Sequence, residues 1–209
     1  MPQVPEATEL AVKGLAGERG GEVIFSEVSF SLAPGEALLV TGPNGSGKST
    51  LLRILAGLLQ PADGSVLFRN GGEAWPNLGA ASHYLGHLNA MKPALSVEEN
   101  LVFWQKFLGN ALTSPLKALE SVGLDGIGHI PFGYLSSGQK RRSAIARLLV
   151  SYRPVWLLDE PTAGLDRSSG MRLQELMRAH LGEGGFIVAA THLPLGLEGA
   201  REISMAASA

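Results

Sequence analysis

The chain has 209 residues, of which 45% are hydrophobic and 17% are charged, against a usual charged fraction of about 25%. This length and composition indicate a globular protein of one domain or two small ones, and they exclude a disordered or fibrous chain. A net charge of -2 gives no basic field typical of a nucleic-acid partner. Because there is no cysteine, disulfides, zinc ribbons, iron–sulfur clusters and thiol nucleophiles are excluded.

The first third of the sequence predicts strands followed by one helix. Apolar and β-branched runs predict strands at 9–13, 23–32 and 36–41. A glycine-rich loop at 42–47 then leads into leucines and isoleucines at helical spacing, and Pro61 ends that helix. A short strand is expected at 66–68.

The middle of the sequence predicts helices. Ser96 and Glu99 form a capping box that begins a helix ending at Leu108. Ser114-Pro115 begins a second helix, because proline suits the first helical turn. A third helix is expected to begin near Ser137.

The last third returns to alternating strand and helix. The apolar runs 155–158 and 186–190 are typical of strands buried on both faces of a parallel sheet, with a helix at about 168–181 between them. We therefore expect a single α/β domain over 1–209, with a core from 1–92 and 153–209 and a helical insertion at about 93–152.

The sequence also predicts where the protein works. Its apolar runs are strand-length, far below the roughly 18 residues that a membrane-spanning helix requires. Residues 1–6 lack the basic and apolar regions of a secretory signal. We expect a chain that is made and kept in the cytosol.

The segment 42–50 matches the GxxxxGK[ST] phosphate-binding pattern, between a predicted strand and a predicted helix. Glycines allow backbone N–H groups to approach phosphate oxygens, and the helix N-terminus adds positive partial charge. Lys48 is expected to reach the β- and γ-phosphates, and the Ser49 hydroxyl to bind Mg²⁺. The alternative is a chance match of a glycine-rich turn. The residues are Gly42, Pro43, Asn44, Gly45, Ser46, Gly47, Lys48, Ser49 and Thr50.

Two acids end the apolar run 155–158. Asp159 and Glu160 stand at the carboxyl end of a predicted central strand, where open α/β sheets bind ligands. We expect Asp159 to hold Mg²⁺, through water, and Glu160 to polarise the attacking water as general base. The alternative is a helix N-cap or a solvated turn.

A third motif, LSSGQ at 135–139, begins the helix near Ser137. Hydroxyls, a glycine and free helix N–H groups form a second anion site. The alternative is an ordinary N-cap at Ser137 in front of a solvated basic face made by Lys140, Arg141 and Arg142.

Together these motifs resemble, in order, those of the nucleotide-binding subunits of ATP-binding-cassette (ABC) transporters. The resemblance implies a P-loop NTPase core with an antiparallel β part and an inserted helical subdomain. It also implies ATP and Mg²⁺ as cofactors, and a homodimer packed head to tail across ATP. By the same resemblance, the signature motif is Ser136, Ser137, Gly138 and Gln139, the D-loop includes Asp166, the catalytic base is Glu160 and the switch histidine is His192.

The segments 84–87 and 96–101 resemble more narrowly the haem-exporter branch of the family, the ATPases of cytochrome c maturation. This implies transmembrane partner subunits of the maturation complex and a peripheral position on the cytoplasmic face of the inner membrane. The sequence has no CxxCH motif, so we expect no direct haem binding. The alternative function is a soluble cassette that acts on nucleic acid or in iron–sulfur assembly; the single cassette and the charge of -2 favour the exporter.

Two positions depart from the usual family pattern. Where the family commonly has a glutamine, at the entry to the helical subdomain, this chain has His87; the alternative is a shifted loop in which Asn89 takes the role. Where an aromatic residue usually stacks on adenine, the chain has Arg19, whose guanidinium can also stack on a purine. Phe25, the nearest aromatic residue, is expected in the core.

The remaining histidines do not predict a metal site. His83 and His87 are four residues apart in a segment with strand character, which does not place them on one helical face. His129 and His180 are expected at the surface or at helix ends.

Overall fold

The computed structural model describes residues 9–69 and 75–206. The segment 1–6, for which no secretory signal is predicted, lies outside this range. By compactness the chain divides into two units: Met1–Tyr84 with Pro154–Pro161 and Arg178–Ala209, and Leu85–Arg153 with Thr162–Met177. The sequence-based boundaries at 93 and 152 stay a prediction.

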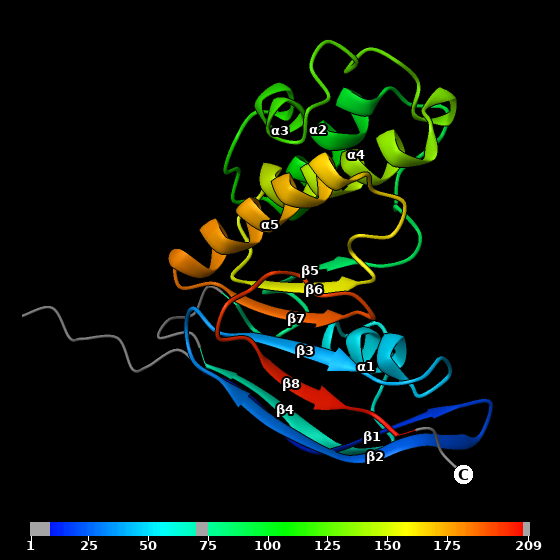
Figure 1. Cartoon of the computed structure of the whole chain (residues 1–209), viewed down its shortest axis with the longest axis vertical. Helices are drawn as coiled ribbons and strands as arrows, with labels where there is room; N and C mark the ends of the chain where they lie inside the picture. Colours follow the sequence, from blue (N-terminus) through cyan, green and yellow to red (C-terminus); the bar gives the residue numbers. More distant parts are fainter. Residues whose placement is uncertain (1–8, 70–74, 207–209) are drawn as a thin grey trace, which may run out of the picture. The chain divides into compact units, whose positions relative to one another are not determined.

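Three strands of the first unit form an antiparallel sheet. β1 (Glu9–Arg19) is central, with β2 (Glu22–Leu32) on one side and β4 (Asp63–Arg69) on the other (Figure 1). β1 continues beyond the predicted end at residue 13, because the pairing with β2 shifts register after Val12 and then resumes at Leu15.

The second sheet of the first unit has five strands in the order β5-β6-β7-β3-β8. β3 pairs in parallel with both β7 and β8, and β6 pairs in parallel with β7. Every residue of β6 and β7 is buried, as the continuous apolar runs predict, and the predicted α/β fold is confirmed. The strands are β3 (Ala37–Thr41), β5 (Ser82–Leu85), β6 (Val155–Asp159), β7 (Phe186–Ala190) and β8 (Arg201–Ser204).

Most helices begin at the capping residues that the sequence predicts. Ser96 and Glu99 form the expected capping box of α2, and the Ser114 hydroxyl caps α3. The helix expected to begin near Ser137 does begin there, as α4, and only the alternative that made Ser137 its N-cap is wrong: Ser136 is the N-cap, since its hydroxyl accepts from the Gln139 N–H. The helices are α1 (Lys48–Leu55), α2 (Val97–Leu108), α3 (Pro115–Ser121), α4 (Ser137–Val150), α5 (Arg167–Gly182) and a 3₁₀ turn, η1 (Phe132–Tyr134).

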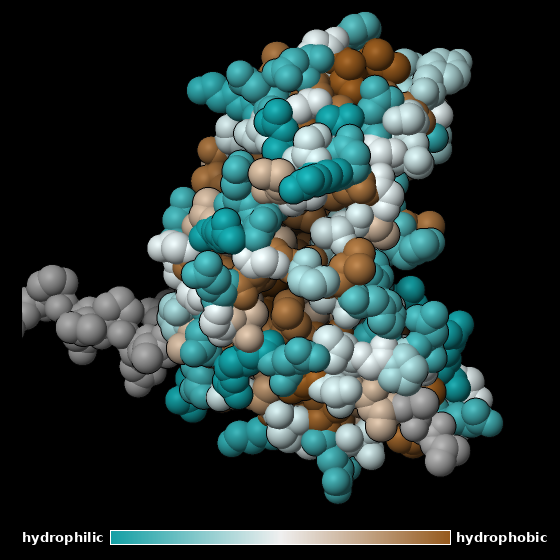
Figure 2. Space-filling model, viewed as in Figure 1, coloured by the Kyte–Doolittle hydropathy of each residue, from teal (hydrophilic) through white to brown (hydrophobic). Residues whose placement is uncertain are grey.

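The core of the first unit lies between α1 and its two sheets. Leu10, Leu38, Leu52 and Phe186 are fully buried there, and Phe25 belongs to the same cluster, as predicted. On the face drawn in Figure 2, hydrophilic residues cover most of the surface and hydrophobic residues show in smaller groups between them. Within the described part of the chain, no helix is both long and apolar enough to cross a bilayer.

Of the two places expected for His180, the surface or a helix end, the helix end is confirmed, because His180 lies in the last turn of α5. The residue is not at the surface: it is only 7% exposed, and its ring stacks on Trp156 with centroids 4.2 Å apart. Its Nε2 lies 3.1 Å from the Pro154 carbonyl oxygen. Burial lowers the pKa of His180 to about 4, so the ring is neutral at physiological pH. His129 is exposed, as predicted.

Candidate nucleotide-binding site

The phosphate-binding loop connects β3 to the N-terminus of α1. Gly42 and Gly47 adopt φ angles of 132° and 90°, which side-chain-bearing residues rarely do. A Cβ at Gly42 would also collide with the Met205 carbonyl oxygen, and one at Gly47 would lie 2.7 Å from the Phe25 ring. The loop therefore requires glycine at both ends for backbone conformation and for space.

Lys48 is held over this loop. Its ammonium donates to the carbonyl oxygens of Gly42 and Pro43 at 2.7 and 2.8 Å. Although the residue as a whole is only 8% exposed, it lines the cavity beside the loop. A cation in this position can meet a phosphate with little change in the backbone.

The two acids follow β6, as predicted. Asp159 is buried, and the hydroxyl of Tyr84 at the end of β5 lies 3.5 Å from its Oδ2. The Tyr84 hydroxyl also hydrogen-bonds Arg53 of α1, which raises the pKa of that guanidinium. A carboxylate, a phenol and a guanidinium thus form one chain from the end of β6 to α1.

Glu160 has a positive φ of 44°, and its N–H donates to the Ala190 carbonyl oxygen at 2.9 Å. This bond ties the residue to the end of β7, where His192 follows. The Oε1 of Glu160 and Nε2 of His192 are 3.6 Å apart, and the same Nε2 lies 3.1 Å from Asn44 Oδ1 of the loop. Strained backbone outside glycine is typical of functional sites.

One cavity of about 250 Å³ brings together the predicted site residues of the first unit except Gly42, Pro43 and Ser46 of the loop. Ser49 and Asp159 supply hydroxyl and carboxylate oxygens, which are the ligands that Mg²⁺ prefers, so the residues fit this ion. Arg19 lies at the same cavity from the end of β1. The residues that line the cavity are Arg19, Ile24, Asn44, Gly45, Gly47, Lys48, Ser49, Thr50, Asp159, Glu160 and His192. Ser46 is fully buried inside the loop.

The signature motif lies in the second unit, at the start of α4. Ser136 and Gln139 cap the helix reciprocally, at 3.3 and 3.0 Å between side chain and backbone. Ser137 is exposed and Gly138 is half-buried. A Cβ at Gly138 would lie 3.4 Å from the Gly164 carbonyl oxygen, an ordinary contact.

The basic face behind the motif is not solvated as a whole. Arg141 is 6% exposed and donates to the Gly86 carbonyl oxygen at 2.8 Å. Arg142 donates to the Gly123 carbonyl oxygen at 2.7 Å. These arginines connect α4 to the turns around it.

Asp166 caps α5 within the second unit. Its Oδ1 accepts from the Ser169 N–H at 2.7 Å and from the Ser168 hydroxyl at 2.9 Å. The Ser169 N–H, followed by the serine hydroxyls, lowers the pKa of Asp166 to about 2. The carboxylate is therefore ionised at neutral pH.

His87 is exposed, in the bend after β5. It belongs to the second unit, and its role as a substitute for glutamine stays a prediction. Within 9–69 and 75–206, no group of three or more His, Cys, Asp or Glu residues could hold a metal ion.

Sequence reasoning missed the polar neighbours of the site. Tyr84 had no predicted role, although its place at the end of β5, beside β6, indicates contact with Asp159. Away from this site, within the second unit, sequence reasoning also missed Arg147, which is buried with its guanidinium 4.6 Å above the Trp104 ring. Burial, and to a lesser degree Arg141, lowers the pKa of Arg147 to about 10.

Residues 25–163 match the family model described as ABC transporter, which includes the phosphate loop, the signature motif and both acids. The chain belongs to the ABC transporter family. The predicted resemblance is thereby confirmed.

Curated relatives in this family align over nearly the whole chain. The cytochrome c biogenesis ATP-binding export protein CcmA of Chelativorans sp. is 71% identical, over 95% of this chain and 98% of the relative. The protein with that name from Mesorhizobium japonicum is 63% identical, over 91% and 95%. A solved ATP-binding cassette, a dimer in a post-hydrolysis state bound to ADP and Pi, is 25% identical with a TM-score of 0.80, over 96% and 97%. The chain is an ATP-binding ABC ATPase.

Proposed function

We propose that this chain is the ATP-hydrolysing subunit of an ABC exporter that serves cytochrome c biogenesis, with haem handling by its partners. The observation that carries the chemistry is the single cavity shared by Lys48, Ser49, Asp159, Glu160 and His192. The biological setting is supported by relatives named cytochrome c biogenesis ATP-binding export protein, at 71% and 63% identity.

Each group at the cavity has a role in phosphoryl transfer, which depends mainly on positioning and charge stabilisation. Lys48 and the loop N–H groups bind the phosphates, and Ser49 and Asp159 would hold Mg²⁺, which would supply positive charge against the phosphates. Glu160 accepts hydrogen bonds from the attacking water as general base. His192, 3.6 Å from Glu160, meets the γ-phosphate and keeps the carboxylate oriented. Arg19 stacks on the adenine.

The catalytic unit is a head-to-tail homodimer. Ser137 and Gly138 of one protomer contact the γ-phosphate bound at the cavity of the other. Asp166 lies at the same interface between the protomers. Two observations support this: Ser136 and Gln139 are engaged in capping α4, which leaves Ser137 exposed, and the solved relative bound to ADP and Pi is described as dimeric.

The chain binds its membrane partner on the cytoplasmic side of the inner membrane. An exposed aromatic group on α2, in the second unit, is evidence for such a partner. Phe103 is 43% and Phe107 70% exposed, and the Lys92 ammonium lies over the Phe103 ring. Apolar groups exposed in this way are typical of interaction surfaces. His87, close to Lys92 in sequence, transmits the nucleotide state to that partner.

Complementation tests the proposal. In a host that lacks its own copy of this ATPase, the wild-type chain should restore assembly of c-type cytochromes, detected by haem staining. The Glu160→Gln variant should be produced and should bind to the membrane, but it should restore no assembly of c-type cytochromes. Full cytochrome c assembly without any copy of the chain, or with Glu160→Gln, would contradict the proposed function.

A further inference from the structure

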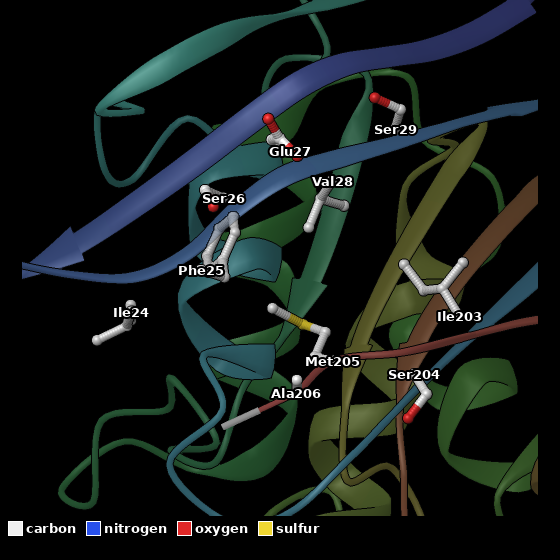
Figure 3. A pocket seen from close by; sticks show the side chains of 10 residues that line it. All are labelled: Ile24, Phe25, Ser26, Glu27, Val28, Ser29, Ile203, Ser204, Met205 and Ala206. Carbon is white, nitrogen blue, oxygen red and sulfur yellow. The ribbon is translucent and has the colours of Figure 1, made fainter. Parts of the chain in front are cut away.

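The first unit has a second and larger cavity, of about 410 Å³, between β2 and β8. Residues 24–29 form one wall and residues 203–206 the other. Figure 3 shows Phe25, Val28 and Met205 around the space between the two strands. Phe25 and Met205 are buried and apolar, whereas Glu27, which also lines the space, is exposed. The volume lies within the range of sites that bind ligands, about 300–1,000 Å³. We call this space the β2–β8 groove.

Among the strands that the structure describes, both walls of the groove are edge strands. β2 ends the order β2-β1-β4, and β8 ends the order β5-β6-β7-β3-β8. The Met205 N–H donates to the Thr41 carbonyl oxygen at 2.8 Å, on the β3 side. Successive residues of a strand direct their backbone groups to opposite edges, so those of Ser204 face away from β3. An edge of this kind is a template for one more strand.

The groove is adjacent to the phosphate loop. Ile24 lines both this groove and the cavity that contains Lys48 and Glu160. Met205 leaves no space for a Cβ at Gly42, and the Phe25 ring leaves none at Gly47. Any molecule that fixes Phe25 and Met205 therefore also restricts the two glycines between which the loop changes direction.

The charge of this part of the chain favours a basic occupant. Among the described residues that line the groove, Glu27 is the one with a charged side chain. The first unit as a whole has 13 acidic and 7 basic residues, whereas the second has 6 acidic and 10 basic. Cytoplasmic segments of membrane proteins have an excess of Lys and Arg.

We propose that the β2–β8 groove binds an extended, basic cytoplasmic segment of the membrane partner, which adds to β8 as a further strand. Its apolar side chains would pack on Phe25 and Met205, and a Lys or Arg would meet Glu27. This inference rests on the proposed function, because it assigns a binding site to the exporter's membrane subunit. Since linkage is reciprocal, a segment that orders Met205 and Phe25 also changes the affinity for ATP, by the same factor as ATP changes the affinity for the segment.

Hydrogen exchange on the purified exporter tests the site. The amides of 203–206 and 24–29 should exchange at least about tenfold more slowly in the complete complex than in the free chain. The amides of 65–67 on β4, the other edge of the three-stranded sheet, should not change. Protection that instead depends on the concentration of the free chain would assign the groove to a second copy and overturn the proposal.

Matched substitutions provide an independent test. Glu27→Lys and Ser26→Trp, both exposed at the groove, should weaken binding to membranes containing the partner subunits about tenfold. Their controls are Glu183→Lys and Ser65→Trp, which make the same changes at exposed positions outside the groove. Urea unfolding and ATP binding of the free variants should match those of the wild type.

The two levels of inference fail differently. If the wild-type chain does not bind the membrane subunits at all, the proposed function and the groove inference are both refuted. If it binds, and the groove segments exchange as in the free chain or all four variants bind equally well, the groove inference alone is refuted.

Discussion

The buried His180 predicts a specific loss of stability in weak acid. In the unfolded chain its pKa is near 6.5, whereas burial against Trp156 lowers it to about 4 in the folded protein. Between these two values the unfolded chain binds a proton that the folded protein does not bind. The free energy of unfolding therefore falls as the pH falls from about 6.5 to about 4, and His180 adds no further change below that.

The magnitude follows from the two pKa values. From about pH 7.5 to about pH 5, the contribution of a neutral His180 decreases by about 2 kcal/mol. A protein of this size has a total stability of about 5–15 kcal/mol, so the loss is measurable. His180→Phe retains a ring that can stack on Trp156 and has no ionisation.

Urea unfolding at both pH values measures the effect. The wild type should lose about 2 kcal/mol more than His180→Phe over this interval, because all other titrating groups are common to both proteins. His129→Phe, at an exposed histidine, should keep the full pH dependence of the wild type. Equal pH dependence in the wild type and His180→Phe would refute the reasoning.

Three further predictions concern the proposed catalytic site. Glu160→Gln should keep ATP affinity and lose at least about a hundredfold in turnover, since the amide keeps the shape but not the base; steady-state hydrolysis at the wild-type rate would exclude Glu160 as the base. Lys48→Ala should weaken ATP binding about tenfold or more in calorimetry, and unchanged affinity would contradict the role of Lys48 on the phosphates. Gly138→Asp should leave ATP binding by the monomer intact and abolish dimerisation and turnover, because the carboxylate meets a phosphate. Mixing Gly138→Asp with Lys48→Ala protein should restore some hydrolysis at the one intact composite site, and loss of ATP binding by the Gly138→Asp monomer would refute the head-to-tail dimer.

Sequence reasoning succeeded where the determinants are local. The capping box at Ser96 is formed by two residues that are three positions apart, and the glycine loop is a continuous segment of the sequence. The apolar run 155–158 is also a local pattern, and it correctly predicts a buried parallel strand. It failed where the determinant is distant. His180 is buried by Trp156 of another element, and the polar segment Arg201–Ser204 becomes a strand only because β3 supplies the hydrogen-bonding edge.

The N-cap of α4 was misplaced by one residue for a different reason. Ser136 and Ser137 are both good capping residues, and only the partner three positions later distinguishes them. Gln139 stands three residues after Ser136, whereas Lys140 stands three after Ser137. Applied fully, the capping-box rule would have selected Ser136.

The capping box at the start of α4 gives the signature motif two separable functions. The side chains of Ser136 and Gln139 each accept a hydrogen bond from the backbone N–H of the other residue. They therefore maintain the local backbone whether or not a second protomer is present. Ser137 and Gly138 form no part of that box. Natural variation in the motif should therefore follow two independent rules. The outer pair can be exchanged for other reciprocal capping residues, such as threonine with glutamate, at little expense to the helix, whereas the inner pair is restricted by what a nucleotide on the opposite subunit requires.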